Sequence, residues 1–175
     1  IGLCVGARYP ASRAVMNAGV SKTRTEHFLP IALNISSGAH NGAIEVGASY
    51  QFQLENLSQS PNELLDLKSI NKESIMSSDA RIAPGFGLVF GDIDIQISKL
   101  AEIYVNSFET GKYFKWAEQF IGYSDYRFGW LLSGLFASIA LDIGLDKRAT
   151  IGLFQISISP LMLAFGIEKS NQPIT

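Results

Sequence analysis

The chain has 175 residues with a formal net charge of −2, and 47% of its residues are apolar and 17% charged. That length and apolar share suffice for a domain with its own core, and the lack of a basic run argues against a nucleic-acid partner. One cysteine and two histidines cannot form a disulfide framework or a zinc cluster by themselves. A carboxylate metal site stays open but has no spacing signal, so we expect no metal site. The single Cys4 suits a reducing compartment, and we predict a cytoplasmic protein.

The start of the chain shows no targeting signal. The first residue is isoleucine, and no basic segment followed by an apolar core comes after it. No secretory signal peptide is therefore visible. We interpret the sequence as a fragment of a longer protein or as a processed chain.

Helical patterns begin near the N-terminus. Residues 8–19 and 27–35 indicate short helices. Ser60, Pro61 and Glu63 form a capping box, which predicts the start of a third helix.

Helical patterns continue to the end of the chain. Apolar residues at helical spacing predict a helix over 95–108, and 112–123 indicates an aromatic amphipathic helix. Gly144 is expected to end the next helix and Asp146 to cap the last one. Strand-like alternation is confined to the short stretch "DIDIQIS". We predict an all-α fold.

Two charge-free stretches, 128–141 and 149–167, raise the alternative of a membrane hairpin. A bilayer span needs about 20 apolar residues. The first stretch has only 14 residues before Asp142, and the second carries Gln155 and Pro160 near its middle. We therefore interpret both as buried helices and expect no membrane partner.

Two segments rich in small residues are candidates for a binding site. In "ISSGAHNGAIEVGAS", residues 35–49, His40 stands among glycines, alanines and serines. In "RIAPGFGLVFGD", residues 81–92, glycines recur without the Lys-Ser/Thr of a P-loop or the frame of a dinucleotide fingerprint. An interhelical turn is the simpler interpretation of 81–92. Glycine also lets backbone N–H and C=O groups approach a ligand closely.

These two segments and the tail resemble the C-terminal half of citrate synthases. "SGAHNGAIEVG" is similar to their Gly-Pro-Leu-His-Gly-Gly-Ala-Asn-Glu segment, and "RIAPGFG" is similar to their Arg-Ile-Pro-Gly-Phe-Gly-His loop. The tail "IGLDKRATIGLFQISISPLMLAFGIEK" aligns without gaps with their Leu-Gly-Ile-Pro helix. The resemblance implies a multihelical citrate synthase-like fold. In it, 1–44 belongs to a large domain, 45–140 forms a small domain on the coenzyme A side, and 141–175 returns to the large domain.

The resemblance also implies roles for particular residues. Enzymes of this family join acetyl-CoA to an oxoacid, or cleave an acyl-CoA such as citryl-CoA, and they pair as homodimers. His40 would lie at a helix start, whose dipole keeps the ring neutral, and would donate a hydrogen bond to the thioester carbonyl as it becomes an enolate. The surrounding small residues would leave room for the thioester arm. Coenzyme A would be a substrate or ligand rather than a tightly bound cofactor. The residues expected to contact it are Arg81, Pro84, Gly85, Phe86 and Gly87.

Several catalytic positions of the family carry other residues here. Leu88 stands where a histidine polarises the carbonyl of the second substrate, and leucine cannot donate a hydrogen bond. Ser133 falls on the proton-abstracting aspartate, and a serine hydroxyl is a very weak base without a partner. The arginines that grip a carboxylate substrate are also replaced, one of them by Ile156.

Another carboxylate could replace the missing base. Asp142 comes nine residues after Ser133, about 180° around a helix, so it is expected to face the other way. Asp125 matches the family's aspartate only in a different register, Asp125-Tyr-x-x-Gly129 against Asp-Phe-Tyr-Ser-Gly, which abandons the tail alignment. Asp125 is therefore the alternative base.

Two hypotheses follow from this pattern. The first is a divergent enzyme that handles an acyl-CoA and a small carboxylate in an altered pocket. The second is a catalytically inactive homologue that serves as a partner or regulatory subunit. The retained His40 and the loop 84–87 favour thioester binding, whereas Leu88 and Ser133 favour lost condensation chemistry.

Overall fold

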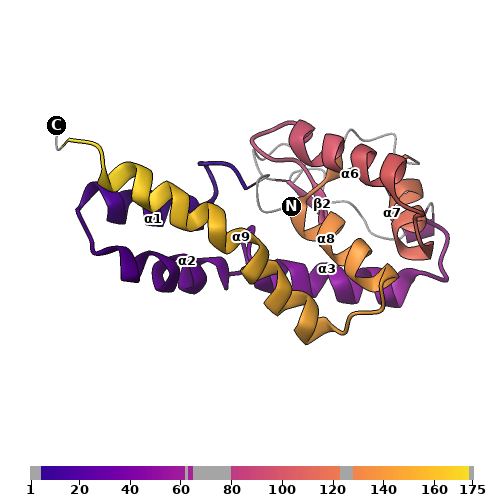
Figure 1. Cartoon of the computed structure of the whole chain (residues 1–175). Helices are drawn as coiled ribbons and strands as arrows, with labels where there is room; N and C mark the ends of the chain where they lie inside the picture. The colour runs from indigo at the N-terminus through magenta and orange to yellow at the C-terminus, as the bar shows by residue number, and fades with distance from the viewer. Residues whose placement is uncertain (1–4, 62, 65–79, 123–127, 174–175) are drawn as a thin grey trace. The chain divides into compact units, whose positions relative to one another are not determined.

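Helices dominate the computed structural model, which describes residues 5–61, 63–64, 80–122 and 128–173 (Figure 1). The predicted all-α fold class is confirmed. A 3-10 helix, η2 (Thr25–His27), precedes the second α-helix. The α-helices among the described residues are α1 (Pro10–Val20), α2 (Phe28–Ser36), α3 (Ala43–Asn56), α6 (Ile95–Ser107), α7 (Lys112–Gly122), α8 (Leu132–Asp142) and α9 (Lys147–Ser170).

The helix boundaries follow the sequence patterns closely. Helices α1, α2, α6 and α7 lie within two residues of the predicted ranges. Gly144 has a φ of +78° just after α8, and its N–H bonds Leu141 O while the Leu145 N–H bonds Ala140 O. This is the Schellman arrangement that favours glycine. The predicted cap at Asp146 is also present, because Oδ1 accepts from the Ala149 N–H at 2.8 Å. The helix predicted from the capping box at Ser60 lies mostly outside the described residues.

The chain divides into two compact units, residues 1–44 with 151–175, and residues 45–150. Each unit is described by itself. The assignment of 45–140 to a small domain, with 1–44 and 141–175 in a larger one, stays a prediction.

The first unit is built from α1, α2 and the C-terminal part of α9, which lie side by side (Figure 1). Its core contains Val15, Phe28 and Met162, all 0% exposed. Two glycines allow the close approach of α9. A Cβ on Gly166 would lie 2.5 Å from the Phe28 ring, and a Cβ on Gly19 would lie 2.5 Å from Gly166 O. Larger residues at either position would push the helices apart.

Helix α9 is buried on one side only. Phe154, Ile158 and Met162 are buried, but Leu153 is 43% and Ile156 67% exposed. The prediction of a buried helix is right for α8 and wrong for this exposed face of α9. Among the described residues, α9 is the helix whose length and apolar composition would let it cross a membrane. That is weak evidence, because core helices of soluble proteins pass the same test.

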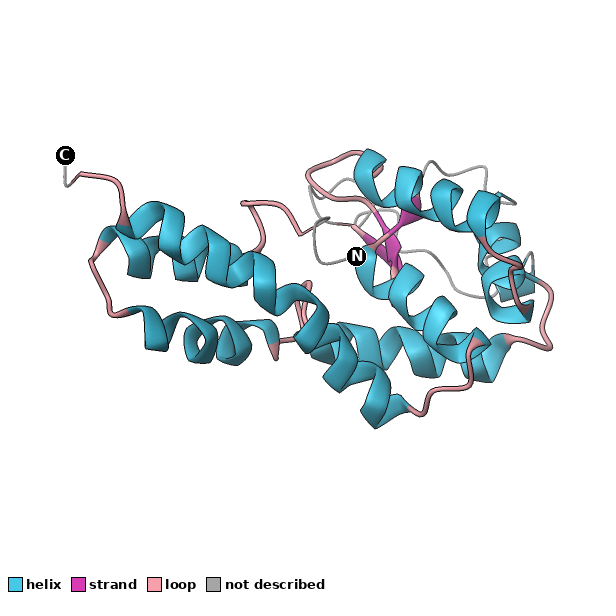
Figure 2. Cartoon of the chain, viewed as in Figure 1, coloured by secondary structure: helices cyan, strands magenta, loops and turns pink. Residues whose placement is uncertain are grey.

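The second unit contains a small sheet that the sequence analysis did not predict (Figure 2). Strands β1 (Arg81–Ala83), β2 (Phe86–Gly87) and β3 (Gly129–Trp130) pair antiparallel in the order β1-β2-β3. Phe86 pairs with Ala83 on one side and with Trp130 on the other. Two or three residues are too few to show an alternating pattern. The sequence analysis consequently interpreted 81–92 as a simple turn.

An aromatic core fixes this sheet against the helices. The Phe86 ring is 0% exposed and lies 5.0 Å from Phe120 of α7 and 6.2 Å from Phe52 of α3, between ring centroids. Trp116 stacks on Phe120 at 5.4 Å. Such aromatic pairs contribute about 0.5–1.5 kcal/mol each beyond the area they bury. The loop that carries Phe86 is therefore rigidly attached to α3 and α7.

Candidate functional site

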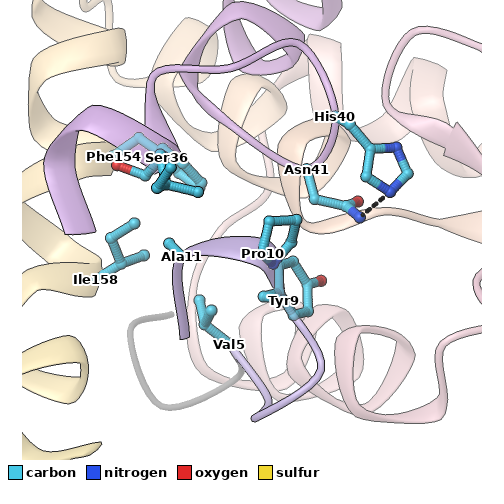
Figure 3. Close-up of a pocket in the computed structure, with 10 residues that line it drawn as sticks. Val5, Tyr9, Pro10, Ala11, Ser36, His40, Asn41, Phe154 and Ile158 are labelled. Carbon is cyan, nitrogen blue, oxygen red and sulfur yellow. Dashed lines mark hydrogen bonds between the residues drawn. The ribbon is translucent and has the colours of Figure 1, made fainter. Parts of the chain in front are cut away.

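His40 lies in the bend between α2 and α3, three residues before Ala43, with an exposed side chain. Its Nε2 is 3.0 Å from Asn41 Nδ2 (Figure 3). An amide nitrogen donates and does not accept, so Nε2 is the acceptor in this pair. This pairing corresponds to the ring tautomer that has its proton on Nδ1.

The small residues around His40 close a tight bend. A Cβ on Gly42 would lie 2.4 Å from Gly38 O and 2.6 Å from Ser36 O, so only glycine fits. The Ile44 N–H bonds Gly38 O at 3.3 Å and completes the bend. Asn41 has a φ of +55°, in the left-handed region that asparagine tolerates better than most residues. Much of the local glycine and alanine content thus has a backbone explanation.

The cavity beside His40 is too small for coenzyme A. Its volume is about 10 Å³, and its lining includes Tyr9, Pro10 and Asn41 (Figure 3). Such a volume holds about one water molecule. A thioester that meets His40 would have to contact the exposed side of the ring and not this cavity.

Arg81 takes part in an ion pair with α3. Its Nε lies 2.7 Å from Glu45 Oε1, and Nη1 donates to Leu88 O at 3.3 Å. Glu45 is only 7% exposed, and a carboxylate buried to that extent requires a cation or several hydrogen bonds. Sequence reasoning assigned Arg81 to coenzyme A and did not single out Glu45. The pairing spans 36 residues, and no local motif indicates it.

The loop Pro84–Gly87 is packed against the start of α8. Gly85 has a φ of +87°, and a Cβ there would lie 2.1 Å from Ser49 Oγ and 2.5 Å from Gly134 Cα. The Leu131 N–H donates to Gly85 O at 3.0 Å. The structure therefore brings this loop next to the first turn of α8, which carries Ser133.

Leu88 and Ser133, the positions where the resemblance predicts lost catalytic residues, are both buried. Leu88 is 8% exposed, and its backbone N–H pairs with Ala80 O. Ser133 is 4% exposed, and its hydroxyl has no hydrogen-bond partner among the described residues. A buried hydroxyl without a partner costs about 1–3 kcal/mol. The unsatisfied group at Ser133 was not predictable from the sequence.

The structure describes Asp142 but not Asp125, the two carboxylates considered as replacement bases. Asp125 lies outside the described residues. Asp142 accepts from the Tyr113 N–H at 2.9 Å and the Phe114 N–H at 3.1 Å. It therefore caps the N-terminus of α7, where a negative charge is favourable. Its role is structural, in line with the predicted orientation away from Ser133.

A larger groove, of about 410 Å³, lies between α6, α7 and β3 in the second unit. Glu102, Glu118 and Trp130 are among its lining residues. Burial raises the pKa of the Glu118 carboxyl. Among the residues that the structure describes, none of those proposed for the site lines this groove. No group of three or more potential metal ligands occurs among the residues that the structure describes.

Comparison with known proteins identifies the fold. No protein-family model and no curated protein matches the chain. The structure of citryl-CoA lyase from Hydrogenobacter thermophilus matches with a TM-score of 0.70 and 20% sequence identity, over 99% of this chain and 70% of the lyase chain. An identity this low supports a common fold and leaves the activity open. The chain therefore has the all-α citrate synthase-like fold.

Proposed function

We propose that this protein binds an acyl-CoA thioester, of the acetyl-CoA or citryl-CoA type, and that His40 donates a hydrogen bond to its carbonyl. The observation that carries the proposal is the likeness to citryl-CoA lyase over 99% of the chain. The exposed position of the His40 imidazole supports it, because a ligand can reach the ring. A positioned N–H donor stabilises the oxyanion that forms when such a thioester enolises or is cleaved at a carbon–carbon bond. The proposed setting is cytoplasmic.

A catalytically inactive homologue, acting as a partner or regulatory subunit, is the second candidate. Leu88 and Ser133 favour it, since neither side chain can abstract a proton unaided. Both positions are buried, so water does not readily replace the missing groups. In this second function the acyl-CoA would be a bound effector and not a substrate.

Titration calorimetry of the protein with acetyl-CoA, and separately with free coenzyme A, tests the binding proposal. His40→Ala should weaken the binding of acetyl-CoA about tenfold, because a hydrogen bond to a thioester carbonyl contributes about 1–1.5 kcal/mol. The affinity for free coenzyme A should stay unchanged. His27→Ala is the matched control, because His27 is the other histidine and is also exposed. Equal effects of both substitutions, or no binding by the wild-type protein, would refute the proposal.

A further inference from the structure

Gln53 is a fully buried amide on α3, at 0% exposure. Its Nε2 donates to Ser49 Oγ and to Gly134 O, both at 3.1 Å. Its Oε1 accepts from Ser138 Oγ at 2.6 Å. Ser49 and Ser138 are also 0% exposed. The four groups form a polar network inside an otherwise apolar core, where hydrogen bonds are directional and strong.

The network borders the contact between the loop Pro84–Gly87 and α8. Gly134, whose carbonyl bonds Gln53, directly follows Ser133 and packs on Gly85. The Ser49 hydroxyl, which also bonds Gln53, occupies the space where a side chain on Gly85 would lie. One side chain thus bonds two groups that both pack against Gly85.

We propose that Gln53 is a positioning residue, which fixes the loop Pro84–Gly87 and the first turn of α8 relative to each other and so sets the place of Ser133. The inference rests on the acyl-CoA site proposed above. Apolar packing alone can hold α3 against α8, but it is non-directional. The bonds to Gly134 O and Ser49 Oγ specify where these atoms lie. Gln53 acts through its neighbours and contacts no substrate itself.

Gln53→Met tests the positioning role without a ligand, because methionine has a similar length and no hydrogen-bond donor to replace Nε2. The matched control is Gln51→Met on the same helix, since the Gln51 side chain donates to the exposed Glu55. Hydrogen exchange at the Leu131 amide, which bonds Gly85 O, should accelerate about tenfold or more in Gln53→Met. Exchange at the Leu145 amide, at the other end of α8, should stay as in the wild type in both variants.

Binding of acetyl-CoA provides the functional measurement. Gln53→Met should raise the Kd about tenfold, and Gln51→Met should leave it unchanged. In Gln53→Glu, an ionised carboxylate cannot donate to Gly134 O, but a protonated one can. The Kd of Gln53→Glu, relative to the wild type at each pH, should therefore improve as the pH falls. A buried carboxyl also destabilises the fold as the pH rises, so the urea midpoint of Gln53→Glu at each pH is the control for this profile.

The outcomes separate the two proposals. If the wild-type protein binds no acetyl-CoA, the acyl-CoA site is refuted. The exchange data then still report whether Gln53 holds the loop Pro84–Gly87 against α8. If it binds acetyl-CoA, and Gln53→Met changes neither the Kd nor exchange at Leu131, the positioning role is wrong. Should Gln53→Met fail to fold, Ser138→Ala removes the contacts of Ser138 Oγ with Gln53 Oε1 and Gly134 O and keeps both bonds of Gln53 Nε2. The same two changes are then expected to be smaller.

Discussion

Replacing Gly85 by alanine should be among the most damaging single-methyl additions to this chain. The residue has a φ of +87°, and an L side chain in the left-handed region costs about 1–2 kcal/mol. The added Cβ would also lie 2.1 Å from Ser49 Oγ and 2.5 Å from Gly134 Cα. Overpacking of a close-packed core costs about 1–3 kcal/mol. The two effects together predict a loss of about 2–5 kcal/mol in the free energy of unfolding.

Gly91→Ala separates the cost of a positive φ from the cost of overpacking. Gly91 has a similar φ of +83°, but a Cβ there would meet nothing within 4 Å. Urea denaturation of both variants should therefore show a loss of about 1–2 kcal/mol for Gly91→Ala and a clearly larger one for Gly85→Ala. Equal losses would show that the loop is not tightly packed on α8. The attachment of the loop described above would then be wrong.

Three further predictions concern pH and chemistry. Burial raises the pKa of the Glu118 carboxyl, so the folded state binds this proton more tightly than the unfolded state. The free energy of unfolding should therefore fall as the pH rises and Glu118 loses its proton. Glu118→Gln should flatten that part of the pH profile of the urea midpoint, and an unchanged profile would contradict the assignment. The wild-type protein should release no thiol from acetyl-CoA with oxaloacetate, and Leu88→His with Ser133→Asp should restore little, since the carboxylate-binding arginines are missing too. Robust turnover by the wild type would overturn the register that places Ser133 at the base position. Ser133→Ala removes an unsatisfied buried hydroxyl, so it should raise the urea midpoint, and it should weaken acetyl-CoA binding only if that hydroxyl contacts the ligand.

Features encoded by neighbouring residues were predictable from the sequence. The cap at Asp146 and the glycine at 144 act within a few residues of the helix ends that they define, so their patterns indicate the structure directly. Helices α6 and α7 follow from apolar spacing in the same way. Local chemistry is enough for such elements because their hydrogen bonds close within one turn.

Features that join distant parts of the chain were not predictable. Strand β2 pairs with β3 through Phe86 and Trp130, which are far apart in sequence. The ion pair of Arg81 with Glu45 spans 36 residues, and the bond of Gln53 to Gly134 spans 81. Each is set by tertiary packing, and a glutamine on an amphipathic helix gives no sign that it will be buried. The candidate site was therefore predictable in its segments and not in its supporting contacts.

The first turn of α8 indicates which chemistry this site can support. Its N-cap makes no side-chain hydrogen bond, and the first turn has no acidic residue. A helix N-terminus favours negative charge and offers N–H donors. At Ser133, which the proposed resemblance aligns with a carboxylate base, this chain has a buried hydroxyl without a hydrogen-bond partner among the described residues. A thioester carbonyl is the kind of acceptor that such a hydroxyl requires. The described part of this turn thus offers a hydrogen-bond donor and no carboxylate, which supports the proposed binding of a carbonyl over removal of a proton.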